Sequence, residues 1–176
     1  MKTMQNRGYI QVYTGNGKGK TTAALGLTLR AAGAGKKVFI AQFVKGQRYS
    51  EVKAIEQFLP MVEIKQYGLN CFIRNKPAKA DIDAAQTGLR EIKEIILSGK
   101  YDVVVLDEAN IAVYYGLFST QELIDIIKQK PTETEIVITG RYAAPELIEV
   151  ADLVTEMKEI KHYYTQGVEA RIGIEH

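Results

Sequence analysis

The chain has 176 residues, of which 46% are hydrophobic and 25% charged, and its formal net charge is +2. This composition is typical of a globular protein with a full core, and the near-neutral charge gives no electrostatic case for nucleic-acid binding. The single cysteine, Cys71, excludes an internal disulfide and fits a reducing compartment, and no apolar run reaches the ~20 residues of a membrane span. The first residues also lack the apolar core of a secretory signal. We therefore expect one domain over residues 1–176, in the cytoplasm, with neither nucleic acid nor membrane as a partner.

Apolar runs and helical periodicities alternate along the chain. Strands are predicted over 9–14, 38–43, 62–67, 103–106, 135–139 and 153–157, and helices over 20–32, 50–59, 81–97, the segment opened by the Ser119–Glu122 capping box, and 145–150. The alternating polarity of 62–67 indicates a half-exposed edge strand. The pattern predicts a three-layer α/β domain with a mainly parallel sheet of about six strands.

A glycine-rich stretch, TGNGKGKTT at 14–22, joins the first predicted strand to the first helix. Glycines let backbone N–H groups converge on an anion, with the positive end of the helix behind them. Thr14 stands where the GxxxxGK[ST] pattern has its first glycine. The predicted ATP-binding residues are Gly15, Asn16, Gly17, Lys18, Gly19, Lys20, Thr21 and Thr22. Lys20 is expected to contact a phosphate oxygen, and Thr21 to offer its hydroxyl to a metal ion. The alternative is a glycine-rich turn with solvated lysines.

The run VVVLDE at 103–108 ends in two carboxylates. An apolar strand that delivers acids beside a glycine loop is the Walker B arrangement, in which an acid holds magnesium or its water. Asp107 and Glu108 are therefore predicted metal ligands, together with Thr21. The alternative is that Asp107 merely caps the next helix. With the two motif-bearing strands expected as neighbours, the class is a P-loop NTPase-like (RecA-like) fold.

Further basic residues are expected at the carboxyl ends of strands, where open α/β sheets bind ligands. Lys45 and Arg48 follow the strand over 38–43, and Arg141 follows the strand that begins at Glu135. All three are candidate anion contacts, and solvated or surface ion-paired side chains are the alternative. His162 has no cysteine or histidine cluster beside it, so a zinc site is not expected. The aromatic tail from Lys161 onwards is predicted to fold back over the sheet.

The order of these segments resembles a known family. TGNGKGKTTAA, VVVLDE, VITGR, ADLVTEM, KHYY and ARIGIE are similar to the P-loop type ATP:corrinoid adenosyltransferases, from about Gly8 to Glu175. The resemblance implies transfer of the 5′-deoxyadenosyl group of ATP to the cobalt of a reduced corrinoid, with release of triphosphate. It also implies a homodimer, a reduced flavoprotein as electron donor, and magnesium (or manganese) as the metal.

The resemblance also assigns roles to residues. Family members are understood to hold ATP reversed, with the γ-phosphate where other P-loop proteins hold the α-phosphate. Metal on Thr21 and Glu108, with Lys18, Lys20 and Arg141, would then neutralise the departing triphosphate. Lys20, Glu108 and Arg141 are accordingly placed in the catalytic set. Since cobalt(I) is itself the nucleophile, no catalytic base is needed.

The chain departs from the family in the loop over 68–78. Family members carry a phenylalanine and a tryptophan there, which press on the lower corrin face and expel the axial ligand. This chain has no tryptophan, and an ungapped alignment puts Cys71 and Ile73 at those positions with Phe72 between them. Phe72 is assigned the lower-face role, and the alternative is that it anchors the loop to the core.

Two other classes of function remain open on the residues alone. A small-molecule or nucleotide kinase would need a base near its acceptor, and Asp107 could serve. A RecA-like ATPase switch would release ADP and phosphate. The near-neutral charge and the lack of a basic stripe disfavour a nucleic-acid motor.

Overall fold

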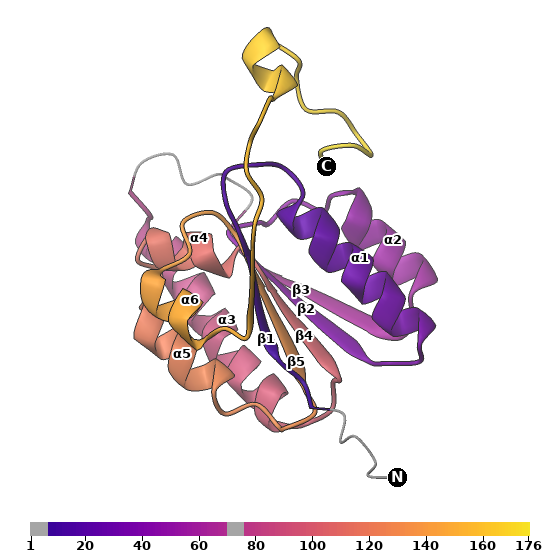
Figure 1. Ribbon diagram of the computed structural model, residues 1–176, viewed down its shortest axis with the longest axis vertical. Coiled ribbons are helices and arrows are strands. Elements are labelled where there is room, and N and C mark those ends of the chain that lie inside the picture. Colours follow the sequence, from indigo (N-terminus) through magenta and orange to yellow (C-terminus); the bar gives the residue numbers. More distant parts are fainter. Residues whose placement is uncertain (1–6, 70–75) are drawn as a thin grey trace.

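The computed structural model describes residues 7–69 and 76–176. They form a six-stranded sheet with strand order β3-β2-β4-β5-β1-β6, in which every pairing is parallel (Figure 1). The strands are β1 (Ile10–Thr14), β2 (Val38–Phe43), β3 (Val62–Tyr67), β4 (Val103–Asp107), β5 (Glu135–Thr139) and β6 (Leu153–Glu156). The α/β class, the six strands and the edge position of β3 are confirmed.

Helices cover both faces of the sheet, which gives the three layers expected (Figure 1). One face carries α1 (Lys20–Gly33) and α2 (Ser50–Phe58); the other carries α3 (Lys79–Leu97), α4 (Ala109–Tyr114), α5 (Thr120–Ile127) and α6 (Pro145–Val150). Within residues 7–69 and 76–176, no helix has the length and apolar character needed to cross a membrane.

The core is divided by the sheet into two clusters. In β2, Phe39, Ala41 and Phe43 pack with the helices of the α3 face, while Val38 and Ile40 pack under α1 and α2. Successive side chains of a strand point to opposite faces, so an uninterrupted apolar run is what a strand covered on both faces requires. All six residues of β2 are buried.

The strand order corrects one expectation. The strand of the glycine loop, β1, and the strand of the acid pair, β4, are not neighbours, because β5 pairs with both of them. Ile136 of β5 lies in register with Ile10 on one side and Val104 on the other. β5 is apolar enough to occupy the centre of the sheet, and no local pattern encodes that position. Its carboxyl end therefore lies between the two motifs.

Three further differences concern helices and the tail. Helix α3 begins at Lys79 rather than at Asp81, because the Asp81 carboxylate accepts a hydrogen bond from the Ala78 N–H at 2.8 Å and caps the first turn. Helix α4 was expected only under the alternative in which Asp107 caps a following helix, and no bounds were predicted for it. The tail, which includes a 3₁₀ turn (Tyr163–Gln166), does not cover the sheet; both faces already carry helices, and it instead projects beyond the carboxyl ends of the strands (Figure 1).

Candidate active site

The candidate site is a pocket of about 660 Å³ at the carboxyl ends of the parallel strands. It is bounded by the glycine loop, the segments after β2 and β4, the turn after β5, and the end of the tail. The residues that line it include Gly17, Lys18, Lys20, Thr21, Lys45, Glu108, Tyr115, Arg141 and Glu175. Pockets of this size suit nucleotide-sized ligands.

The glycine loop is shaped by close backbone contacts. Gly15 and Gly19 have positive φ values of 94° and 118°, which a residue with a side chain rarely adopts. A Cβ atom on Gly15 would lie 2.5 Å from the carbonyl oxygen of Met157, and the Gly17 N–H donates to that oxygen at 2.6 Å. The chain after β6 therefore packs directly on the loop.

The lysine of the loop is buried within it. Lys20 is 7% exposed, and its ammonium donates to the carbonyl oxygens of Gly15 at 2.8 Å and Gly17 at 2.7 Å. Burial lowers the pKa of Lys20, as does the charge of Arg141, while Glu108 and Asp107 oppose the shift. These contacts fold Lys20 back over the loop at the floor of the pocket.

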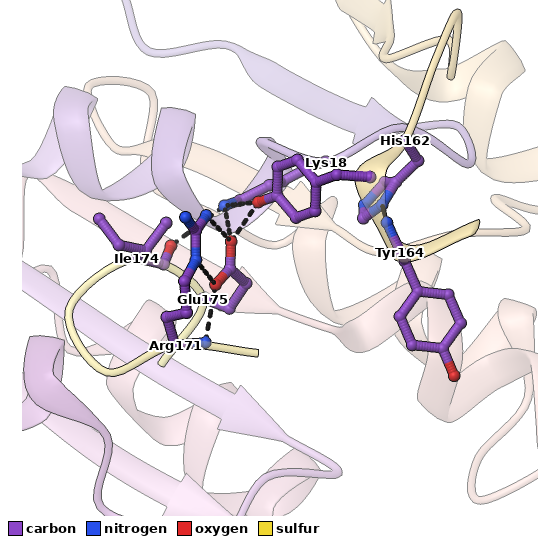
Figure 2. Close-up of polar contacts among 7 residues, drawn as sticks. Lys18, His162, Tyr164, Arg171, Ile174 and Glu175 are labelled. Carbon is purple, nitrogen blue, oxygen red and sulfur yellow. Dashed lines mark hydrogen bonds and ion pairs between the residues drawn. The ribbon is translucent and has the colours of Figure 1, made fainter. Parts of the chain in front are cut away.

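The end of the tail binds the other lysine of the loop. The Lys18 ammonium donates to the Glu175 carboxylate at 2.7 Å, and to the Ile174 carbonyl and the Tyr163 hydroxyl, each at 3.1 Å. Figure 2 shows Lys18, Arg171 and Glu175 directed at one another. Arg171 donates to Glu175 through its backbone N–H at 2.8 Å and through its guanidinium. These donors hold the pKa of Glu175 far below its usual range.

The Glu175 carboxylate thus binds the ammonium of Lys18, which is predicted to contact phosphate. Glu175→Gln is expected to strengthen MgATP binding by about threefold, because an exposed ion pair is weak and a phosphate would no longer compete with a carboxylate for Lys18. Calorimetry measures the effect, and Glu169→Gln, an exposed glutamate of the same tail, is the control. Equal or weaker affinity for Glu175→Gln would show that the tail does not compete with the nucleotide.

Asp107 is fully enclosed by donors. Its Oδ1 accepts from the hydroxyls of Thr21 at 2.8 Å and Thr139 at 2.6 Å, and its Oδ2 accepts from Lys45 at 2.8 Å and Gln42 at 3.2 Å. Burial raises the pKa of Asp107, but Lys45 and the hydroxyl donors outweigh it and leave the pKa lowered. The alternative that Asp107 caps the following helix is wrong, because the residue before α4 is Glu108 and no side chain caps the helix.

Glu108 lines the pocket and has a strained backbone conformation. Its φ is 59°, in the left-handed region, and its N–H donates to the Thr139 hydroxyl at 3.0 Å. Strain of this kind in a non-glycine residue is typical of functional sites. Burial and the negative charge of Asp107 raise the pKa of Glu108. The carboxyl group therefore holds its proton more tightly than an exposed glutamate does.

The three other basic residues that were predicted as anion contacts have different surroundings. Lys45 points into the pocket and pairs with Asp107; burial lowers its pKa, but the charges of Asp107 and Glu108 outweigh this and leave the pKa raised. Arg48 instead pairs with Glu56 on α2, so the surface alternative holds for it. Arg141 lines the pocket, and none of the ion pairs between described residues involves it.

Some predicted residues are not tested, and some were missed. Phe72, with Cys71 and Ile73, lies outside the described residues, so its lower-face role stays a prediction. Thr139, which joins Asp107 to Glu108, was missed, although it is a polar residue at the end of an apolar strand. Asn110 was also missed: it is buried, its amide donates to the Gly140 carbonyl at 3.0 Å, and its Oδ1 has no partner among the described residues.

The all-parallel sheet, the glycine loop between β1 and α1 and the acid pair after β4 together define a P-loop-like α/β protein. Residues 6–176 match the family described as ATP:corrinoid adenosyltransferase BtuR/CobO/CobP. The chain belongs to this family. It is 34% identical to the corrinoid adenosyltransferase of Escherichia coli K12 over 99% of this chain and 89% of that protein. It is 35% identical to the corrinoid adenosyltransferase of Pseudomonas aeruginosa over 96% and 84%, and 37% identical to that of a Sinorhizobium species over 96% and 80%.

Proposed function

We propose that the chain transfers the 5′-deoxyadenosyl group of ATP to the cobalt of a reduced corrinoid and releases inorganic triphosphate, in adenosylcobalamin biosynthesis or salvage. The observation that carries the proposal is membership of the family over residues 6–176, joined to one pocket that contains the glycine loop, Glu108 and Arg141. We also propose that residues 1–176 act as a single domain.

The reaction makes one bond and breaks one. The electron pair of cobalt(I) forms the cobalt–carbon bond at C5′, while the C5′–oxygen bond breaks and its electron pair leaves on the triphosphate. Lys18, Lys20 and Arg141 would bind and orient the triphosphate and offset its charge, which stabilises the transition state as charge develops. No proton transfer is needed at carbon or cobalt. The absence of a base from the proposed set fits this scheme.

The donor set at the acid pair suits a hard divalent cation. The Thr21 hydroxyl lies 2.8 Å from the Asp107 carboxylate, and Glu108 adds a second carboxylate at the same strand end. Oxygen ligands of this kind are what magnesium (or manganese) prefers. A metal ion held there would add positive charge beside the departing triphosphate. Coordination needs the deprotonated carboxylate, and because the pKa of Glu108 is raised, protons compete with the metal at a higher pH than they would at an exposed glutamate.

The kinase alternative finds little support in the geometry of Asp107. A catalytic base must be able to accept a proton from its acceptor, yet both oxygens of this carboxylate are occupied and its pKa is lowered. Phosphorus NMR of the products separates the three classes of function. Adenosyl transfer gives triphosphate, a kinase gives ADP and a phosphorylated acceptor, and an ATPase gives ADP and phosphate. Either ADP result would refute the proposal.

The proposed partners follow from the family. A homodimer is proposed, and light scattering of the purified protein would test it, with a monomeric mass as the contrary result. A reduced flavoprotein is proposed as electron donor, and a cytoplasmic location goes with it. Turnover of a cobalt(II) corrinoid with a small reduced flavoprotein tests the donor. Failure there, with normal turnover of chemically generated cobalt(I), would remove the flavoprotein from the account.

A pair of stacked tyrosines, each next in sequence to a residue that lines the pocket, offers a surface for the corrin ring. Tyr114 and Tyr142 are 58% and 51% exposed, and their ring centroids lie 4.3 Å apart. Tyr114 also contacts Tyr115, which lines the pocket, and Tyr142 follows Arg141 with a left-handed φ of 60°. We propose that this exposed pair contacts the corrin ring, because a flat apolar ligand gains most from exposed rings.

Truncation of Tyr114 and Tyr142 tests the proposed contact with the corrin ring. Tyr114→Ala with Tyr142→Gly, which suits the left-handed backbone, is expected to raise the KM for cobalt(I) corrinoid by roughly five- to tenfold, the range of aromatic stacking contacts. The KM for ATP is expected to stay within about twofold. Phe58→Ala, which shortens an exposed aromatic residue at the far end of α2, is the control. An unchanged corrinoid KM would show that the pair does not contact this substrate.

A further inference from the structure

Lys45 sits where the sequence placed a metal ion. Its ammonium lies 2.8 Å from the Asp107 carboxylate and 3.3 Å from the Thr21 hydroxyl. Both of these oxygens belong to the predicted metal-ligand set. The Lys45 side chain is 16% exposed and that of Asp107 is 1% exposed, so the contact lies beneath the surface of the pocket. Lys45 is the cation that balances the Asp107 carboxylate in this structure.

The backbone next to Lys45 is strained. Val44 has a φ of 57°, and a β-branched residue in the left-handed region is a genuine outlier. Strained residues persist only where the surrounding structure enforces them, and they gather at functional sites. Here the strained residue directly precedes the side chain that enters the pocket.

A neighbouring glycine is required by the same arrangement. A Cβ atom on Gly68 would lie 2.3 Å from the backbone nitrogen of Lys45 and 2.6 Å from the carbonyl carbon of Val44. No side chain fits there without moving the turn after β2. The turn is thus held from two sides, by its own left-handed residue and by the close approach of Gly68, and both fix the direction in which Lys45 leaves β2.

The charge balance indicates what Lys45 does. A divalent ion on Thr21 and Asp107 would need the oxygens that the ammonium now contacts, and two cations cannot share them without repulsion. A lysine is a compact charge on a flexible stem with rotatable donors, so it can turn to another acceptor nearby. The pocket is the place where a phosphate chain is proposed to lie, and Lys45 lines it.

We propose that Lys45 is an exchangeable cation: it neutralises Asp107 in the metal-free protein, is displaced when a divalent metal ion binds to Asp107 and Thr21, and then pairs with the triphosphate. The second half rests on the proposed function, since it assumes that a phosphate chain occupies the pocket. Metal binding and phosphate binding would in this way be coupled through one side chain, because the metal frees the lysine that the triphosphate uses.

Lys45→Gln tests both halves, because an amide still donates a hydrogen bond to Asp107 but carries no charge. Calorimetry with MgCl2 alone is expected to show Mg²⁺ binding about tenfold tighter than in the unmodified protein, since a competing cation is gone. Calorimetry with inorganic triphosphate at saturating Mg²⁺ is expected to show binding about tenfold weaker. Arg48→Gln removes a cation of the same loop that pairs outside the pocket, and both affinities should then stay within about twofold.

Unchanged Mg²⁺ affinity in folded Lys45→Gln would refute the proposal that the metal ion displaces Lys45. Unchanged triphosphate affinity would refute the proposal that Lys45 then pairs with triphosphate. The unmodified protein gives an independent test in case the variant does not fold. With ¹⁵N-labelled lysine, the Lys45 ammonium signal should shift on addition of Mg²⁺, and an unaffected signal would refute displacement. These assays contain no corrinoid. They can therefore refute the role of Lys45 while the product analysis still supports adenosyl transfer, and the product analysis can refute adenosyl transfer while these assays still support the role of Lys45.

Discussion

Lys20→Ala is expected to weaken MgATP binding by about tenfold or more. The ammonium contributes a charge-assisted contact to phosphate of roughly 1.5–3 kcal/mol, which corresponds to a factor of ten to about a hundred in affinity. In this structure the same ammonium donates to the carbonyl oxygens of Gly15 and Gly17, so the variant also removes two contacts that fix the shape of the loop. Both effects weaken binding.

Calorimetry with MgATP measures the change in a variant whose far-ultraviolet circular dichroism is unaltered. Lys37→Ala is the matched control, because Lys37 is exposed and directly precedes β2, at the amino end of the strand and so at the opposite edge of the sheet. Unchanged ATP affinity in folded Lys20→Ala would remove the glycine loop from nucleotide binding.

Substitutions of the two acids should have different effects: loss of Asp107 mainly lowers the stability of the fold, and loss of Glu108 mainly lowers turnover. Asp107→Asn is expected to lower the free energy of unfolding by about 3–5 kcal/mol, because it breaks a buried ion pair and leaves the Lys45 ammonium uncompensated. Glu108→Ala is expected to reduce turnover roughly a hundredfold, as the loss of one electrostatic contact to a transition state does, with the fold intact. Urea denaturation and steady-state kinetics measure the two effects. Full magnesium-dependent activity in both variants would refute the metal assignment.

The pH dependence of the metal-free protein should distinguish the same two residues. The pKa of Asp107 is lowered on folding, so the stability that it contributes is present above its unfolded pKa of ~3.9 and is lost as pH falls through the folded value. The pKa of Glu108 is raised, so the stability cost of its charge is absent below its unfolded pKa of ~4.3 and grows to its full size as pH rises through the folded value. Glu108→Ala should therefore gain stability relative to the unmodified protein near neutral pH, and lose that gain in acid.

The sequence predicted elements better than their arrangement. The bounds of β2 and β3 could be read directly, because a mostly apolar run and an alternation of apolar and polar residues each indicate a strand. The insertion of β5 between β1 and β4 could not, since strand order depends on contacts between distant segments. Helix α4 carries no capping side chain, and so it had no start signal to read.

The same distinction applies to the site. The glycine loop and the acid pair were found because each is a local pattern of residues. Lys45 and Arg48 could not be separated, since only the left-handed turn at Val44 decides that the first enters the pocket. The contact of Glu175 with Lys18 joins residues 157 positions apart, and no spacing in the sequence announces it.

The most direct measurement follows the carbon that is proposed to move. The protein is incubated with Mg²⁺, chemically reduced cobalt(I) corrinoid and ATP labelled at C5′, and the corrinoid and phosphate products are separated and counted. The label is expected to be bound to cobalt in a light-sensitive product, with one inorganic triphosphate released for each adenosyl group. Label that remains in ADP, with a phosphate transferred or released and no cobalt–carbon bond formed, would contradict it.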